Sequence, residues 1–340
     1  MRILIIGNAE PTHVGGHFLQ ASRSSNAEVA ASLMSVREAY QAPRLVRALY
    51  WHLLGKRPAR LQSFSEALVR RCAQEKPDLV LATGIAPVTA RALAQLRQMG
   101  VWTANFLTDD PWNKAHHAPW FMSALPRYDH IFTPRHANEP DLRALNGPTV
   151  SYLPFAYAPE IHFPPVETDP QDLPDVSGKL LFIGGADDER AEIMGTLHQR
   201  GIPISVWGGY WAQRPALRAH AHGHAGPAMF RRLVGSAAIN LCLVRRANRD
   251  GHSMRTFELP AVGGCLLVED TEDHRTFFGA PGQCVRYFAS LMEMETEARE
   301  LMQNAATRRQ LAEAAHRRIC VEGRHTYADR LQTIINMRAR

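Results

Sequence analysis

The residues best able to do chemistry lie in residues 250–264, which read DGHSMRTFELPAVGG. This pattern predicts a loop that leads into a helix, with Ser253, Met254 and Arg255 at the helix N-terminus. A guanidinium such as that of Arg255 can bind a diphosphate through two parallel hydrogen bonds. Glu258 lies about one helical turn further along and can accept hydrogen bonds from a ribose diol. The same two side chains could instead form an ordinary ion pair on a surface helix.

Two neighbouring carboxylates, Asp109 and Asp110, form a second candidate site. They follow an apolar stretch in the first half of the chain, and strand ends of this kind commonly line binding sites. A carboxylate placed there can act as a general base toward a hydroxyl group. His13, in the loop after the first apolar run, is a third candidate base. Alternatively, the two carboxylates cap the turn that begins at Pro111, because Asp is common before Pro in turns.

Glycine pairs precede helical patterns in both halves, as Gly15 and Gly16 and as Gly184 and Gly185. Without side chains the backbone can approach a ligand closely, and a helix N-terminus offers free N–H groups. The alternative is a flexible turn. Neither the dinucleotide fingerprint G-x-G-x-x-G at Gly7 nor a P-loop motif is present, so NAD and P-loop chemistry are disfavoured.

The elements that must position these residues follow one repeated pattern. Apolar runs at residues 2–7, 77–84 and 179–185 end in glycine, and helical patterns follow them. Continuous apolar strands that alternate with helices predict a doubly wound α/β fold with ligands at the strand ends, in a cleft between two halves. Residues 148–178 carry seven prolines and predict a linker. The predicted parts are an N-terminal domain, a hinge, a C-terminal domain and a tail helix, at residues 1–160, 161–178, 179–325 and 326–340.

No residue set has the spacing of a metal site. The five cysteines are widely spaced and form no C-x-x-C motif, which indicates a reducing compartment. His220, His222 and His224 alternate, but no nearby residue completes a ligand set. The sequence therefore predicts no bound metal.

Length and charge limit the remaining possibilities. A chain of 340 residues fits two domains. Its formal charge of +6 comes from basic residues spread along the chain, which does not indicate nucleic-acid binding. Neither a secretory signal nor a membrane-spanning stretch is evident. We expect a cytoplasmic protein whose positive charge allows peripheral contact with an anionic membrane surface.

Two C-terminal segments carry a family resemblance. SMRTFELPAVGGCLLVEDTEDHRTFF and RRICVEGRHTYADRLQTII resemble the C-terminal half of the CgeB-like (spore maturation protein) glycosyltransferases of bacteria. The resemblance extends upstream through HGHAGPAMFRRLVGSAAINLCLV, YLPFAYAPEIHFPP and LTDDPW. It covers most of the chain and is strongest over residues 220–335.

The resemblance implies a GT-B fold, in which two Rossmann-like domains face one another across a cleft and a C-terminal helix crosses back. It also implies a hexosyltransferase-type enzyme that uses a nucleotide-diphosphate sugar and needs no metal or cofactor. Trp207 and Gly208 would lie near the base, Glu258 at the ribose and Arg255 at the diphosphate. Asp250 stands where retaining enzymes of the wider group have a first Glu, so an inverting or a retaining mechanism stays open. The acceptor could be a glycan, a protein or a small molecule. A non-catalytic binding protein and a nucleotide-sugar epimerase are the alternatives.

Overall fold

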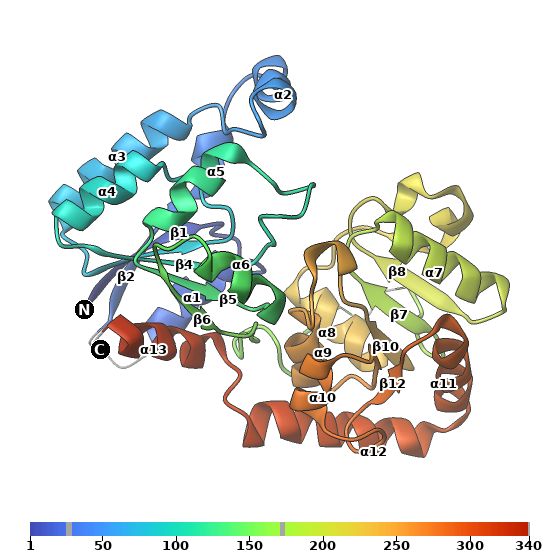
Figure 1. The fold of residues 1–340 in the computed structure, drawn as a ribbon. Helices are drawn as coiled ribbons and strands as arrows, with labels where there is room; N and C mark the ends of the chain where they lie inside the picture. Colours follow the sequence, from blue (N-terminus) through green and yellow to red (C-terminus); the bar gives the residue numbers. More distant parts are fainter. Residues whose placement is uncertain (25–28, 171–173, 339–340) are drawn as a thin grey trace. The chain divides into compact units, whose positions relative to one another are not determined.

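The computed structural model describes residues 1–24, 29–170 and 174–338, which form two compact units. Unit 1 consists of Met1–Pro154, Arg245–Asp250 and Tyr327–Arg340. Unit 2 consists of Phe155–Val244 and Gly251–Thr326. Figure 1 follows the chain from blue to red, and its last helix, α13, belongs with the blue strands of unit 1.

Unit 1 is built on a parallel sheet of six strands in the order β2-β1-β3-β4-β5-β6. The chain places β2 on one side of β1 and the later strands on the other, which creates a switch point between β1 and β3. In doubly wound sheets, ligands bind at such a point, beyond the carboxyl ends of the strands. The strands are β1 Arg2–Gly7, β2 Ala30–Ser35, β3 Leu79–Thr83, β4 Trp102–Phe106, β5 His130–Thr133 and β6 Thr149–Tyr152.

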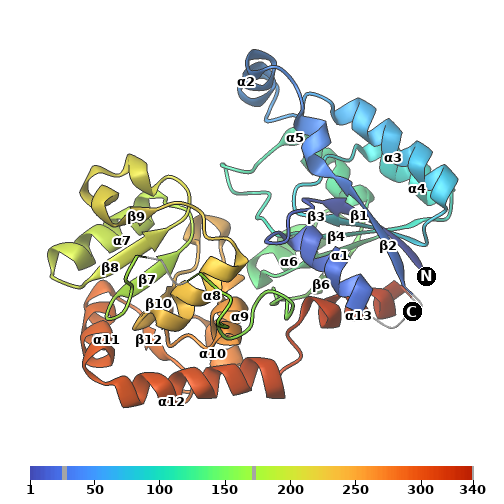
Figure 2. The same ribbon diagram turned by 180° about the vertical axis from the view of Figure 1, so that it is seen from behind.

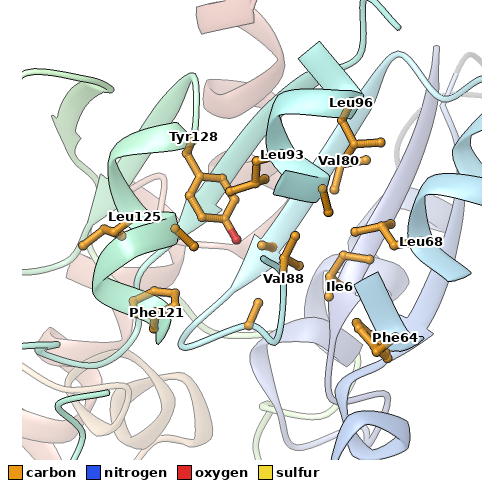
Figure 3. Packing of buried hydrophobic residues seen from close by; sticks show 14 of the residues in the cluster. Ile6, Phe64, Leu68, Val80, Val88, Leu93, Leu96, Phe121, Leu125 and Tyr128 are labelled. Carbon is orange, nitrogen blue, oxygen red and sulfur yellow. The ribbon is translucent and has the colours of Figure 1, made fainter. Parts of the chain in front are cut away.

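Helices cover both faces of this sheet, and one hydrophobic core lies under α3, α4 and α5. Figure 3 shows Phe64 and Leu68 of α3 near Ile6, and Leu93 of α4 beside Tyr128, all within one cluster of buried side chains. Each fully buried side chain of this size contributes roughly 1.5–3 kcal/mol. On the other face α1 packs against α13. The helices are α1 Val14–Ser24, α2 Arg44–Leu53, α3 Leu61–Glu75, α4 Ala90–Gln98, α5 Pro119–Ala124, α6 Glu139–Arg143 and α13 Tyr327–Arg338.

Unit 2 repeats this design with the strand order β12-β11-β10-β7-β8-β9. All its strands pair in parallel, and its switch point lies between β7 and β10 (Figure 2). The strands are β7 Leu180–Ile183, β8 Ile204–Trp207, β9 Ala221–His222, β10 Ile239–Cys242, β11 Leu266–Glu269 and β12 Arg286–Phe288. The helices are α7 Asp188–Gln199, α8 Pro227–Ser236, α9 Arg255–Val262, α10 Glu272–Phe278, α11 Leu291–Gln303 and α12 Ala305–His316.

Shorter elements account for several differences from the sequence-based expectations. Residues 36–54 are divided at Pro43 into a 3₁₀ helix and α2, because proline disfavours helical geometry at the residue that precedes it. Helix α13 lies within the predicted tail at residues 326–340, and α11 and α12 precede it as separate helices. The 3₁₀ helices are Val36–Tyr40, Leu125–Arg127, His136–Asn138, Trp211–Gln213, Pro215–His220 and Arg246–Asn248, and a π-helical turn spans Arg317–Glu322.

The predicted hinge at residues 161–178 differs from the observed division, which falls after Pro154. The described part of this segment belongs to unit 2, because Asp169 accepts hydrogen bonds from the guanidinium of Arg231 and is almost fully buried. These bonds hold the pKa of the Asp169 carboxyl below its ordinary value. A proline-rich segment anchored by a buried ion pair is part of a folded unit. No helix in the described ranges is both long enough and apolar enough to cross a membrane.

Candidate functional site

Arg255 is the first residue of α9 and lies at the switch point of the unit 2 sheet. Its Nε atom donates a hydrogen bond of 3.0 Å to the carbonyl of Ile183, the last residue of β7. The guanidinium carbon lies 4.9 Å from the centroid of the Phe230 ring, within cation–π range. The side chain is 32% exposed and therefore reachable from solvent. The structure thus places Arg255 at a helix start beside a strand end, where the sequence pattern put it.

Glu258, one turn further along α9, is buried with 2% of its side chain exposed. Its Oε2 accepts a hydrogen bond from Arg255 Nη1, and its Oε1 lies 3.7 Å from His162 Nε2. His162 Nδ1 accepts the Ala158 N–H at 3.1 Å, so the neutral ring carries its proton on Nε2, on the side of Glu258. In this arrangement Glu258 positions Arg255. The two residues form an ion pair, as the sequence allowed, but α9 is a buried helix and not the surface helix of that alternative. Sequence reasoning missed His162 because it lies in the segment interpreted as a hinge.

A buried histidine and aspartate hold the loop before α9. His252 Nδ1 lies 2.6 Å from Asp273 Oδ2, and His252 Nε2 accepts the Phe155 N–H at 3.1 Å. Because Nε2 is an acceptor, the ring proton is on Nδ1 and is donated to Asp273. A Cβ added at Gly251 would lie 2.5 Å from Asp273 Oδ2, so only glycine fits there. His252 lies inside the stretch that the sequence singled out, but nothing in the sequence pairs it with Asp273.

The first turn of α9 is fixed by a chain of hydrogen bonds. The Ser253 N–H donates to Thr256 Oγ1 at 3.1 Å, and the Thr256 hydroxyl lies 2.9 Å from His274 Nε2. His274 Nδ1 donates to the Glu269 carbonyl at 2.6 Å, so its Nε2 accepts from Thr256. Burial lowers the pKa of His274 to about 4, which keeps the ring neutral at pH 7. Ser253 and Met254, both partly exposed, present this turn to solvent.

The loops after β7 and β8 pack against one another through their backbones. Gly208 has a φ of 128°, and a Cβ added there would lie 2.5 Å from the Gly184 carbonyl. The Gly184 N–H donates to the Trp207 carbonyl at 2.9 Å, and its own carbonyl accepts from Trp211 Nε1 at 2.7 Å. The Gly185 carbonyl accepts from an arginine of α7 at 3.2 Å. The glycines therefore permit close packing of two loops, and the backbone N–H of Gly184 is used within the protein.

Trp207 supports this loop from inside unit 2. Its indole N–H donates to Ser205 Oγ at 3.1 Å, and only 4% of the residue is exposed. The ring stacks on His222 with centroids 4.5 Å apart and an interplanar angle of 19°. The Trp207 ring, whose polar atom already has a partner, therefore offers little surface to a ligand.

Asp110 is buried in unit 1 and forms two hydrogen bonds with Arg249, at 2.7 and 3.1 Å. The Asn138 amide and the Trp112 N–H also donate to it, at 2.9 and 3.0 Å. Burial alone would raise the pKa of Asp110, but these hydrogen bonds outweigh burial and hold the pKa below its ordinary value. A carboxylate held in this way is a poor proton acceptor. The bond from Trp112 is the turn cap that the sequence offered as the alternative.

Asp109 and His13 remain accessible in the same unit. The Asp109 side chain is 36% exposed, accepts the Thr108 hydroxyl at 3.1 Å and lies 3.7 Å from His116 Nε2. The His13 side chain is 50% exposed, with Nε2 at 3.2 Å from Glu10 Oε2. These side chains follow β4 and β1, on the carboxyl ends of the strands. The structure thus separates the candidate bases into an engaged Asp110 and two reachable groups.

Gly15 and Gly16 lie in the first turn of α1 and are buried. Added Cβ atoms would lie 2.7 Å from the Asn8 carbonyl and 2.2 Å from the Glu10 carbonyl, respectively. The loop after β1 therefore folds directly onto this turn. The absence of side chains at these glycines is therefore needed for contact within the protein, and α1 begins at Val14.

Asp250 is placed differently from the expectation that paired it with Glu258 around a sugar. Its side chain is 7% exposed and forms an ion pair with Arg135, which is 2% exposed. Arg135 also donates to the Thr108 carbonyl at 2.8 Å. Asp250 packs within unit 1, because the buried guanidinium of Arg135 needs a carboxylate partner. Neither this pair nor Arg249–Asp110 has a sequence signal, because the paired residues are more than a hundred positions apart.

Across residues 1–24, 29–170 and 174–338, no three His, Cys, Asp or Glu side chains are grouped so that they could hold a metal ion.

Residues 190–336 match a family model described as glycosyl transferase-like. The match runs from α7 into α13 and includes the α9 turn with Arg255 and Glu258. No curated protein matches the chain.

Solved structures of similar fold cover almost the whole chain. Sucrose-phosphate synthase from Thermosynechococcus elongatus is 11% identical, with a TM-score of 0.69 over 99% of this chain and 98% of that one. A UDP-forming α,α-trehalose-phosphate synthase from Burkholderia xenovorans is 13% identical, with a TM-score of 0.64 over 99% and 98%. The UDP-GlcNAc 2-epimerase from Neisseria meningitidis, bound to UDP-GlcNAc, is 12% identical, with a TM-score of 0.54 over 99% of both chains. These similarities confirm the predicted GT-B fold class.

Proposed function

We propose that this protein is a glycosyltransferase that takes a sugar from a nucleotide-diphosphate sugar. The family match over residues 190–336 and the GT-B fold support this class of reaction. The observation that carries the proposal is the position of Arg255, a reachable guanidinium at the switch point of the unit 2 sheet. The resemblance of residues 253–278 to CgeB-like glycosyltransferases supports the same assignment.

In this proposal Arg255 binds the diphosphate of the donor. Its planar guanidinium can form two parallel hydrogen bonds to phosphate oxygens, and its charge offsets the charge that develops on the leaving group. Glu258 positions Arg255 through their ion pair. The α9 N-terminus, with Ser253 and Met254, adds a favourable dipole for an anion. Gly208 packed on Gly184 keeps the adjacent loops in place.

We also propose that diphosphate stabilisation by Arg255 makes a metal unnecessary. Activity is then expected to survive treatment with EDTA. Complete loss of activity with EDTA, restored by manganese or magnesium, contradicts this part of the proposal.

For an inverting reaction we propose Asp109 as the base that takes the acceptor proton, with His13 as the second choice. Asp109 is reachable from solvent and near His116, whereas Asp110 is buried against Arg249. The acceptor, whether a glycan, a protein or a small molecule, is assigned to unit 1 in this proposal.

The test of the proposed function is nucleotide binding and donor turnover. Calorimetry with nucleoside diphosphates and their sugars is expected to show saturable binding, and release of the nucleoside diphosphate from the sugar is expected to show turnover. Arg255→Ala removes a charged hydrogen bond worth roughly 1.5–3 kcal/mol, so affinity is expected to fall about tenfold or more. The matched control is Arg309→Ala, at an exposed position of α12, which is expected to bind as the wild type does. Equal affinity of both variants contradicts the assignment.

A nucleotide-sugar epimerase is the second candidate, because the similar solved structures include UDP-GlcNAc 2-epimerases. The mass of the product separates the two reactions. An epimer keeps the mass of the donor, whereas a transfer releases the nucleoside diphosphate. Saturable binding without either product would identify a binding protein on the same fold.

A further inference from the structure

Helix α2 of unit 1 leaves all of its residues partly or fully exposed. It is drawn apart from the layer formed by α3 and α4 in both Figure 1 and Figure 2, and none of its residues is buried. Leu45 is 85% exposed and Leu53 is 74% exposed. A soluble monomer seldom leaves a contiguous group of large apolar side chains in water, and such groups mark interaction surfaces.

The apolar side chains form a stripe along one side of α2. Leu45, Leu49 and Leu53 are spaced four residues apart, which places them on one helix face. Val46 lies beside them and, like Leu49, is exposed. We call these four residues the leucine stripe. This face would be buried if α2 bound a partner surface.

The charge around the leucine stripe has one sign. Residues 39–65 contain no Asp or Glu, and they contain five basic residues, Arg44, Arg47, Lys56, Arg57 and Arg60. In the part of the chain that the structure describes, no carboxylate pairs with Arg44, Arg47 or Arg57. A pocket of about 280 Å³ opens beside the helix on this basic side. It is lined by Tyr40, Arg44, Arg47, Ala48, Trp51, His52, Arg57 and Ala59.

The C-terminal end of α2 is anchored to unit 1, whereas the leucine stripe is exposed. Gly55 has a φ of 63° and turns the chain at the helix end. Lys56 Nζ donates to the Lys114 carbonyl, and Trp120 Nε1 donates to the Lys56 carbonyl at 3.2 Å. Pro58, two residues on, is buried. The helix is therefore attached to unit 1 at one end, and it is exposed although it is attached.

We propose that α2 docks unit 1 on an anionic lipid surface. The leucine stripe enters the boundary between headgroups and acyl chains, and Arg44 and Arg47, which helical spacing places on the opposite face of α2, attract the anionic surface. An apolar face opposite a basic face without acidic residues is the pattern of helices that lie in a membrane interface. This site is independent of the proposed glycosyltransferase reaction.

The test is flotation of the full chain with lipid vesicles. Vesicles of phosphatidylcholine with about one third phosphatidylglycerol are expected to carry the protein, and pure phosphatidylcholine much less, because each basic side chain near an anionic surface contributes about fivefold in affinity. High salt is expected to release it. Arg44→Glu combined with Arg47→Glu is expected to lower partitioning about 25-fold or more. Leu45→Ser, Leu49→Ser and Leu53→Ser together are expected to lower it about tenfold or more at unchanged charge.

The matched control replaces two exposed arginines of unit 2, Arg309→Glu and Arg317→Glu, which changes the net charge equally. It is expected to keep most of the vesicle binding. Circular dichroism melting checks that all variants are folded, which is expected because α2 buries no side chain. Equal loss in the control variant, or binding to both vesicle types alike, overturns the proposal. The proposal is also overturned if the protein does not bind vesicles but forms a dimer in sedimentation that the serine variant abolishes. Capture of an acidic protein without vesicle binding overturns it as well.

Discussion

Adjacent aspartates in one loop have different surroundings, and we expect different consequences when each is changed. Asp109→Asn is expected to lower turnover by about 10²–10⁴-fold, because Asn cannot accept the acceptor proton. Asp110→Asn is expected to leave turnover close to that of the wild type. Its effect should appear in the melting temperature, because Arg249 loses a buried counter-charge. Steady-state turnover and thermal melting of both variants make the comparison.

The same pair of variants can contradict the assignment. Wild-type turnover in Asp109→Asn would move the role of base to His13, or would indicate a retaining reaction that needs no such base. Loss of turnover in Asp110→Asn at an unchanged melting temperature would return the role to Asp110. The anomeric signal of the product by NMR separates inversion from retention.

His274 predicts a loss of stability in mild acid. Its pKa is about 4 in the folded protein because of burial, against an ordinary value near 6.5 in the unfolded chain. Between these values only the unfolded chain takes up the proton, so stability is complete above pH 6.5 and falls as the pH drops toward 4. The shift corresponds to about 3 kcal/mol. We expect the slope of unfolding free energy against pH, measured by denaturant unfolding at several pH values, to be shallower in His274→Gln than in the wild type. His130, with a pKa near 4 for the same reason, contributes in the same window, so some slope remains. An unchanged slope would contradict this role.

The sequence could predict the position of Arg255 because a strand, a loop and a helix in succession fix where a helix starts. It could not predict that Glu258 is buried against Arg255 or that Asp110 is engaged by Arg249. Those outcomes depend on which distant side chains the fold brings together. Aspartates one residue apart in the sequence carry the same local signal, and only the tertiary structure distinguishes them.

At the scale of elements, the loop before α9 depends on one glycine. Gly251→Ala would place a Cβ 2.5 Å from Asp273 Oδ2 and disturb the His252–Asp273 pair. We expect a loss of roughly 1–3 kcal/mol in unfolding free energy, together with weaker nucleotide binding, because Arg255 follows this loop. Gly223→Ala is the control, since a Cβ there meets nothing within 4 Å. Equal stability of the two variants would show that the loop adjusts without cost.

The elements themselves were predictable where local chemistry decides them. Apolar runs that end in glycine marked β1, β3 and β7, because buried parallel strands need continuous apolar sequence. Short strands with mixed sequence, such as β2 and β6, carry no such signal. The segment at 161–170 was misjudged because its prolines suggest a linker, whereas the buried Arg231–Asp169 pair that anchors it has no local pattern.

At the scale of the whole molecule, the chain passes between the units more than once, and Asp250 marks one of these passages. Residues 245–250 belong to unit 1, although the residues on both sides of them belong to unit 2. Asp250→Asn is expected to lower the unfolding free energy by about 3 kcal/mol, because it leaves the buried Arg135 without its carboxylate. Asp188→Asn, at a side chain that is 93% exposed, is the control and should melt as the wild type does. Equal melting of both variants would show that Arg135 does not need Asp250.

Helix α13 has a consequence for the order in which the molecule is made. Tyr327 stacks on His17 with centroids 4.7 Å apart and meets the Phe18 ring edge-on at 5.3 Å. During translation, all of unit 2 leaves the ribosome before this helix does, whereas unit 1 begins first and is completed last. Until residues 327–338 emerge, the side of α1 that carries His17 and Phe18 is not covered by α13. A nascent chain paused at that stage would carry a finished unit 2 and a unit 1 that still offers a binding surface to chaperones.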